Sequence, residues 1–121
     1  MNFIKGLLLA ALIICSIFIC STYAQTGFSG KWAVEGKSID GDWRADMTLY
    51  NDGTLSWTDT KPRLLSMIQG TWESDGSTIS MTVKDRTFTS KSISLNFIKD
   101  GTYTISDVHG VIGNGTWYAV K

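Results

Sequence analysis

The tripeptide Gly-x-Trp occurs three times in this chain, at residues 30–32, 70–72 and 115–117. Residues two apart on a strand point to the same face, so each tryptophan shares a face with its glycine. Glycine allows the backbone to bend or another group to approach closely, and tryptophan fills a large volume. The repeat therefore predicts strands that belong to one closed, aromatic-filled sheet, with three tryptophans as core residues: Trp32, Trp72 and Trp117.

Apolar and polar residues alternate along most of the chain, which is the pattern of half-buried strands. Asp-Gly pairs at residues 52–53, 75–76 and 100–101 tolerate the positive φ of tight turns. In the longest segment, residues 87–98, Ile93, Leu95 and Phe97 are expected to share the inner face. The pattern predicts strands over residues 30–35, 43–50, 54–59, 69–73, 77–84, 87–98 (as one bent strand or two), 102–107 and 115–121.

Two segments break the alternation. Residues 60–68 contain Pro62, the only proline, which cannot donate to a strand ladder, so a loop or a single helical turn is expected. Its apolar residues are expected to be removed from water in one of three ways. The segment folds over the barrel mouth as a lid, it forms an exposed patch that a partner protein covers, or it is part of a strand. Residues 108–114, with two glycines and one histidine, are expected to form a second irregular connector.

Many short strands with tight turns and no long helical period predict an all-β protein. Sequential hairpins favour an antiparallel up-and-down barrel of about eight strands, and closing the barrel removes exposed edges. A β-sandwich is the alternative. The length fits a single domain, residues 25–121.

The first 24 residues have the pattern of a secretory signal peptide. One positive charge at Lys5 is followed by an apolar run and then by small residues at Thr22 and Ala24. Cleavage after Ala24 would leave a secreted or periplasmic chain with no integral membrane span. An uncleaved anchor and lipidation at Cys20 are the alternatives. Both cysteines lie in this segment, so the mature chain must be stabilised by its core and not by disulfides.

The charges of the chain are balanced and well mixed. Eleven Lys and Arg residues stand against eleven Asp and Glu residues, and loss of Lys5 with the leader leaves a formal balance of −1. No basic stripe is present that would follow a phosphate backbone, so a nucleic-acid partner is not expected.

Residues 28–32, Phe-Ser-Gly-Lys-Trp, resemble the start of lipocalins, in which Gly-x-Trp begins the first strand. The layout of Gly-x-Trp, hairpin and second Gly-x-Trp is similar to that of small bacterial lipocalin-like (calycin-type) β-barrel domains. The resemblance implies a lipocalin-like barrel that binds a small apolar ligand. The chain lacks the second lipocalin motif and the cysteines that often staple these proteins. It also has no arginine after the last strand to pack on Trp32.

The residues for catalysis are few. His109 is the only histidine, and the mature chain would have no cysteine. One such ligand is too few for a transition-metal site. Residues 40–42, Asp-Gly-Asp, lack the further oxygen ligands of a calcium loop and read as a polar turn. We therefore expect no catalytic residue, no metal, no cofactor and no enzyme activity, although a carboxylate pair in a cleft would indicate a glycosidase-like enzyme instead.

The aromatic and methionine residues are the better candidates for a binding site. Trp43 and Trp57 lie near strand ends, and methionine side chains adapt to irregular ligands. An eight-stranded barrel is either filled by side chains or holds one small ligand, and here large inward residues favour a filled barrel with a shallow mouth cavity. The predicted ligand-binding residues are Trp57, Trp43, Met47, Met81, Phe97, Leu64, Leu65 and Met67.

Two functions fit these features. The first is an exported, non-catalytic binding protein that holds a small apolar or amphipathic ligand at the mouth of the barrel. The alternative is a periplasmic or extracellular protein-binding module, of the inhibitor or immunity type, that uses an exposed loop. The partner is accordingly a small hydrophobic ligand or an unknown protein.

Overall fold

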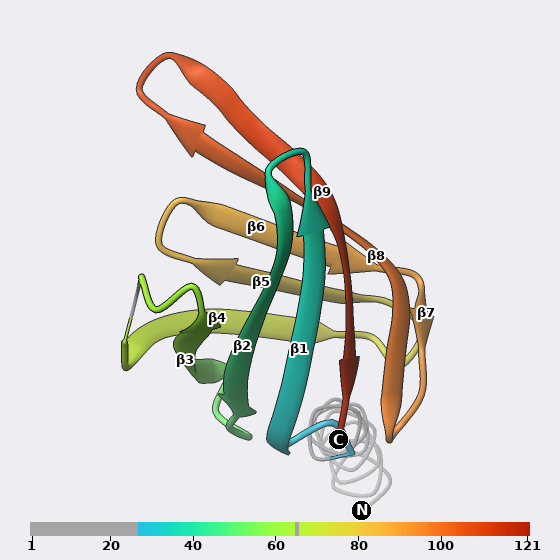
Figure 1. Ribbon diagram of the computed structural model, residues 1–121. Helices are drawn as coiled ribbons and strands as arrows, with labels where there is room; N and C mark the ends of the chain where they lie inside the picture. The colour runs from blue at the N-terminus through green and yellow to red at the C-terminus, as the bar shows by residue number, and fades with distance from the viewer. Residues whose placement is uncertain (1–26, 65) are drawn as a thin grey trace, which may run out of the picture.

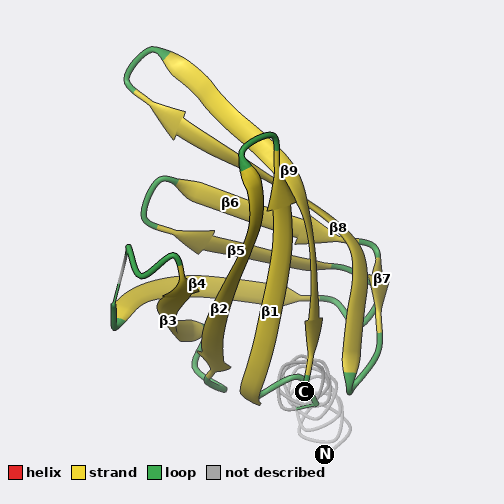
Figure 2. Cartoon of the chain, viewed as in Figure 1, coloured by secondary structure: helices red, strands yellow, loops and turns green. Residues whose placement is uncertain are grey.

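The computed structural model describes residues 27–64 and 66–121, and the regular structure in this part of the chain is entirely β (Figure 2). No helix in it is long and apolar enough to cross a membrane. The predicted signal peptide, residues 1–24, lies outside the described residues. The nine strands are β1 (Gly30–Ser38), β2 (Gly41–Leu49), β3 (Thr54–Lys61), β4 (Ile68–Ser74), β5 (Ile79–Val83), β6 (Arg86–Ser90), β7 (Ser92–Ile93), β8 (Phe97–Asp107) and β9 (Gly110–Val120).

The strands form one antiparallel sheet that closes on itself (Figure 1). Neighbours follow the order β6-β5-β4-β3-β2-β1-β9-β8-β7, and an additional pairing joins β6 to β8. The two-residue strand β7 continues the course of β6 along the first part of β8. The protein is therefore a closed eight-stranded barrel with up-and-down order, consistent with a calycin-like fold, and the predicted fold class is confirmed.

The interior of the barrel is filled along most of its length. The inward residues of β1, β2, β3 and β5 follow the predicted alternation and are buried. The three tryptophans of the Gly-x-Trp repeats are at most 4% exposed, so their prediction as core residues is confirmed. The other buried hydrophobic residues are Phe28, Val34, Ala45, Met47, Leu49, Leu55, Trp57, Ile79, Met81, Val83, Phe88, Ile98, Tyr103 and Ala119.

Glycines make the space for several of these large rings. A Cβ atom built on Gly36 would lie 2.0 Å from the indole carbon Cζ2 of Trp43, and one built on Gly101 would lie 2.3 Å from Nε1 of Trp117. Each ring thus occupies the volume in which its partner's side chain would stand. Three such cross-strand pairs occur: Gly36 with Trp43, Gly101 with Trp117 and Gly115 with Tyr103.

The Asp100–Gly101 pair does not form the predicted turn. Both residues lie inside β8, where the pairing with β9 shifts register between Ile98 and Gly101, and Asp100 has φ of 53°. An Asp-Gly pair supplies positive φ equally well to a turn and to a β-bulge, and here it forms the bulge. The other two Asp-Gly pairs do lie in the turns between strands.

The prediction that Leu95 and Phe97 face the core is wrong. The chain turns between β7 and β8, where the backbone N–H of Ser94 donates to the carbonyl oxygen of Phe97 at 2.8 Å. This turn resets the alternation, so that Ile98 is buried while Phe97 is 40% exposed on the outer face. The Phe97 ring packs there against Tyr118, with a centroid distance of 6.3 Å.

The prediction of an irregular connector over residues 108–114 is also wrong. Strands β8 and β9 continue to a turn at Val108 and His109, and Gly110 follows it with φ of 114°. The resulting hairpin extends beyond the rest of the barrel (Figure 1). Its glycines interrupt the hydrophobic pattern without interrupting the strand, which is why the sequence alone suggested a loop.

The β4–β5 turn is held by one carboxylate. The Asp75 side chain accepts hydrogen bonds from the backbone N–H groups of Ser77 and Thr78, both at 2.8 Å, and from the Thr78 hydroxyl at 3.1 Å. These bonds, first of all the one from Ser77, hold the pKa of Asp75 below its ordinary value of 3.8. The charged form of Asp75 is thus favoured in the folded state.

We expect Asp75→Ala to lower the stability of the protein at neutral pH and to have little effect in strong acid. Because the folded-state pKa is depressed, the contribution of Asp75 is present above about pH 4 and is lost as the pH falls through the folded-state pKa. Denaturant midpoints of the wild type and the variant at several pH values measure this. Glu73→Ala, which removes an exposed carboxylate from the same hairpin, is the control. A difference that persists unchanged in strong acid would contradict the assignment.

Candidate functional site: a cavity at the barrel mouth

One end of the barrel is open and holds a cavity of about 760 Å³. Its rim comes from the β1–β2 turn, the segment after β3 and the protruding β8–β9 hairpin, elements that lie at the same end of the molecule (Figure 1). A volume of this size is in the range of small-molecule sites. Apolar residues form much of the wall: Ile39, Pro62, Leu64, Ile105, Val111 and Ile112.

The floor of the cavity is a cluster of aromatic rings centred on Phe88. The Phe88 ring lies 4.9 Å from Trp57, 5.5 Å from Tyr103, 5.8 Å from Trp117 and 6.0 Å from Trp43, measured between centroids. Phe88, Tyr103 and Trp43 reach the cavity, and the buried core lies below them. The cavity is therefore limited to the mouth, as the sequence predicted for a mostly filled barrel.

A hydrogen bond fixes the exposed part of this floor. The indole Nε1–H of Trp43 on β2 donates to the Tyr103 hydroxyl on β8 at 3.0 Å. Strands β1 and β9 separate β2 from β8 in the sheet, so this bond crosses the interior of the barrel. The two rings also meet edge to face, with centroids 5.4 Å apart. The Trp43 ring is thus held in one orientation at the base of the cavity.

A buried ion pair lies beside the rings. The two terminal guanidinium nitrogens of Arg86 donate to the two carboxylate oxygens of Asp59 at 3.0 and 3.1 Å. The Asp59 side chain is 6% exposed and that of Arg86 is 15% exposed. The indole N–H of Trp57 also donates to Asp59, at 2.9 Å. Since both ionic residues line the cavity, they present a paired, charge-compensated group at its floor.

This ion pair was missed by the sequence analysis. Asp59 on β3 and Arg86 on β6 are separated in the sheet by β4 and β5, so only closure of the barrel brings them together. One signal was present: Leu55, Trp57 and Asp59 are successive inward residues of β3. A carboxylate on an otherwise apolar face requires a buried partner.

Of the predicted binding residues, the structure places Trp43 and Leu64 on the cavity wall. Trp57 is fully buried beneath the floor and reaches the site only through its hydrogen bond to Asp59. Met47 and Met81 are 2% and 1% exposed and belong to the core below. These methionines do not line the cavity.

The remaining predicted residues lie elsewhere. Phe97 is on the outer face of the barrel, away from the mouth cavity. Met67 is 77% exposed and is not part of the cavity wall, whereas Leu64, although it lines the wall, is 70% exposed. Leu65 lies outside the described residues. Leu64 and Met67 are therefore exposed, and of the two only Leu64 lies at the cavity. Ile68 belongs to β4 and packs in part against the core.

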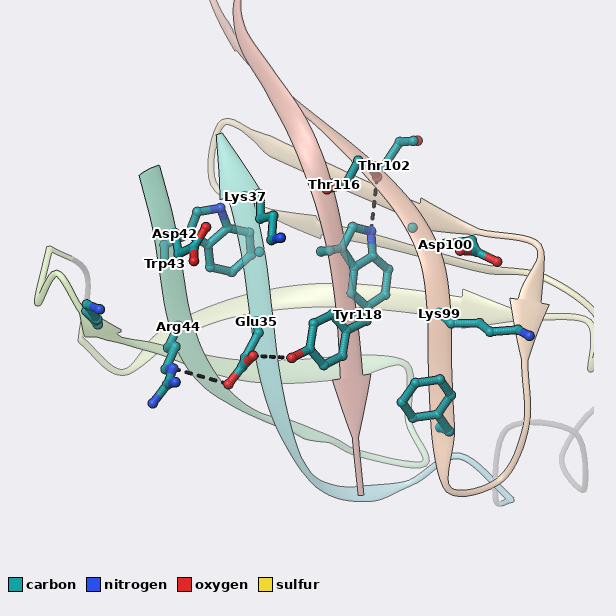
Figure 3. A pocket seen from close by; sticks show the side chains of 15 residues that line it. Glu35, Lys37, Asp42, Trp43, Arg44, Lys99, Asp100, Thr102, Thr116 and Tyr118 are labelled. Carbon is teal, nitrogen blue, oxygen red and sulfur yellow. Dashed lines mark hydrogen bonds and ion pairs between the residues drawn. The ribbon is translucent and has the colours of Figure 1, made fainter. Parts of the chain in front are cut away.

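A second hollow of about 760 Å³ crosses the outer face of β2, β1, β9 and β8 (Figure 3). One ion pair and a hydrogen bond to the same carboxylate lie in this hollow. The Nε of Arg44 lies 3.1 Å from a Glu35 carboxylate oxygen, and the Tyr118 hydroxyl donates to the other oxygen. The bond to Glu35 raises the pKa of Tyr118, because the carboxylate favours the protonated phenol. The outer groove runs across the side of the sheet, whereas the mouth cavity lies at the open end of the barrel over a floor of packed aromatic rings, so the mouth cavity is the better candidate for a binding site.

Among the described residues, no group of three or more His, Cys, Asp or Glu side chains is placed to hold a metal ion. His109 lies at the tip of the β8–β9 hairpin, where its backbone N–H donates to the Asp107 carboxylate at 2.7 Å. Asp40 and Asp42 lie at the β1–β2 turn and contribute to the cavity rim.

A comparison of the sequence with protein-family models found no match, and a comparison with curated proteins found no similar sequence. The fold and the site are therefore known from the structure alone. The protein is a closed antiparallel barrel whose interior is filled by side chains and whose one open end holds a cavity with an aromatic floor.

Proposed function

We propose that this chain is an exported, non-catalytic, lipocalin-like binding protein that holds a small amphipathic ligand in the mouth cavity. The observation that carries the proposal is the cavity itself, which combines apolar walls, an aromatic floor and one buried ion pair. A concave site that combines apolar and aromatic side chains with placed polar groups is the usual composition of small-molecule sites. The signal-like pattern of residues 1–24 supports export.

The exposed apolar residues of the rim support the same proposal. Ile39 is 99% exposed, Leu64 is 70% exposed, and Val111 and Ile112 are each 63% exposed. Apolar side chains that surround a concave site and remain in water mark a surface that is covered when the protein works. An amphipathic ligand that rises from the floor would cover them.

One contact supports the lipocalin-like part of the proposal. The Nζ of Lys121 lies 5.7 Å from the centroid of the Trp32 ring, and it also donates to the carbonyl oxygen of Gly27 at 3.4 Å. The residue that follows β9 is Lys121, and no arginine is present there to pack on Trp32. Here the lysine that follows β9 stacks on this ring in place of an arginine.

Ligand binding is expected to depend on the mouth and not on the outer face of the same strand. Ile112→Asp places a charge on the cavity wall and should weaken an apolar ligand about tenfold, since a charge facing an apolar ligand group costs at least ~1.4 kcal/mol. Val120→Asp, at an outer position of β9 that is 44% exposed, should leave binding unchanged. Titration with a series of alkyl ligands, followed by tryptophan emission, measures both. Equal losses in the two variants would contradict the mouth as the site.

A protein-binding function is the second candidate, and one observation favours it. The protruding β8–β9 hairpin carries Val108, 94% exposed, at its tip, next to the exposed Val111 and Ile112. If the alkyl ligands give no saturable response in the wild-type protein, the ligand-binding proposal fails and this hairpin becomes the surface to test.

A further inference from the structure

The floor of the mouth cavity selects ligands by the charge of the head group, and we infer that it accepts an uncharged polar head and rejects a carboxylate. The inference rests on the proposed ligand-binding function and names the class of ligand: an alkyl chain with a neutral, hydrogen-bonding head, such as an alcohol or an amide. Three features of the cavity support it.

The first feature is the state of Arg86. It is the cation at the cavity floor, and it is already engaged by both carboxylate oxygens of Asp59 at 3.0 and 3.1 Å. A carboxylate ligand that approached the guanidinium would meet the negative charge of Asp59 in a poorly solvated place. Like charges brought together in such a site disfavour binding strongly.

The second feature is the remaining hydrogen-bonding capacity of the guanidinium. Arginine has five N–H donors, of which Asp59 takes two. No other hydrogen bond of this side chain occurs among the described residues. A hydroxyl or amide oxygen accepts such a bond without adding charge. A neutral head group can therefore bind the remaining N–H donors of Arg86 without being repelled by the Asp59 carboxylate.

The third feature is the charge of the whole cavity lining. The lining contains three carboxylates, those of Asp40, Asp42 and Asp59, against two cations, Lys61 and Arg86. The formal balance is therefore −1, which further disfavours an anion. A cationic head would find Asp40 and Asp42 at the rim, but at the floor it would face Arg86. The apolar wall then holds the alkyl chain between floor and rim.

The test compares three probes with ten-carbon chains: decanol below its solubility limit, and decanoate and decyltrimethylammonium below their micelle concentrations. Binding to the wild-type protein is followed by tryptophan emission and by calorimetry. Decanol is expected to bind about tenfold more tightly than either charged probe. Binding of decanoate as tightly as decanol would overturn the inference while leaving the ligand-binding function intact. Absence of binding by all three would overturn the proposed function itself.

Asp59→Asn is the decisive variant. It keeps the size of the side chain and one oxygen acceptor but leaves the charge of Arg86 uncompensated, so decanoate should gain about tenfold and bind about as tightly as decanol. Asp42→Asn is the matched control, because it removes one negative charge from the same lining at an exposed position. Equal gains of decanoate affinity in the two variants would show a general charge effect and overturn selection by the ion pair. If Asp59→Asn does not fold, the order of the three probes on the wild type still decides the inference.

Discussion

Replacing Phe88 with alanine is expected to lower the free energy of unfolding by about 4 kcal/mol, the largest effect of any change considered for this protein. The ring is fully buried and lies within 6.0 Å, centroid to centroid, of four other aromatic rings. Its removal leaves a large void among these rings. The Trp43–Tyr103 hydrogen bond and the Asp59–Arg86 ion pair hold the surrounding side chains in place, so they cannot close the void. Since domains of this size are stable by only about 5–15 kcal/mol, much of the fold's stability depends on this side chain.

Chemical denaturation followed by tryptophan emission measures the effect, and Phe88→Leu is the control. Leucine keeps much of the apolar volume, so it should cost about 1–2 kcal/mol. Near-ultraviolet circular dichroism should change strongly in the alanine variant, because Trp43 and Trp57 lose their packed neighbour. An alanine variant as stable as the leucine variant would contradict the central place of the ring.

Gly115→Ala is expected to lower the free energy of unfolding by about 3 kcal/mol. A Cβ atom at this position would lie 2.0 Å from the carbonyl oxygen of Lys37 and 2.6 Å from the Tyr103 hydroxyl. The first of these is backbone of the neighbouring strand β1, so the strands must separate to accept even one methyl group. Because Tyr103 also accepts the Trp43 hydrogen bond, the strain should spread to the cavity floor.

Gly113→Ala on the same strand is the matched control for this prediction. Its Cβ would meet the Ile105 side chain at 3.6 Å, an ordinary contact. The substitution should be neutral or should stabilise the protein by up to about 1 kcal/mol, because alanine restricts the unfolded chain. Thermal and denaturant unfolding compare the two variants directly. Equal effects of Gly113→Ala and Gly115→Ala would show that the tight packing around Gly115 does not matter.

The strands were predictable because their cause is local. Alternation of side chains across a strand repeats every two residues, so Met47, Leu55 and Met81 could be placed on the inner face from the sequence alone. The failures occurred where a local signal has two structural outcomes. Asp100–Gly101 supplies positive φ to a bulge as readily as to a turn. The turn before Phe97 reverses the faces of Phe97 and Ile98, and the bulge then restores the expected face at Tyr103.

The candidate site was only partly predictable, for a different reason. Trp43 and Leu64 were identified because they lie at a strand end and in a loop, where barrel mouths are built. Trp57 was placed on the correct face, but its depth in the barrel was not visible in the sequence. The structure puts it under the floor, fully buried, where it orients Asp59 through a hydrogen bond.

The sequence by itself determined that this chain forms an all-β barrel with tryptophans in its core, because the hydrophobic period and the turn residues act within a few positions of one another. Only the tertiary structure decided what lies at the mouth. The pairing of Asp59 with Arg86, and of Trp43 with Tyr103, joins strands that are not neighbours in the sheet. Such contacts depend on how the barrel closes and how its strands are staggered, and no local pattern records that geometry.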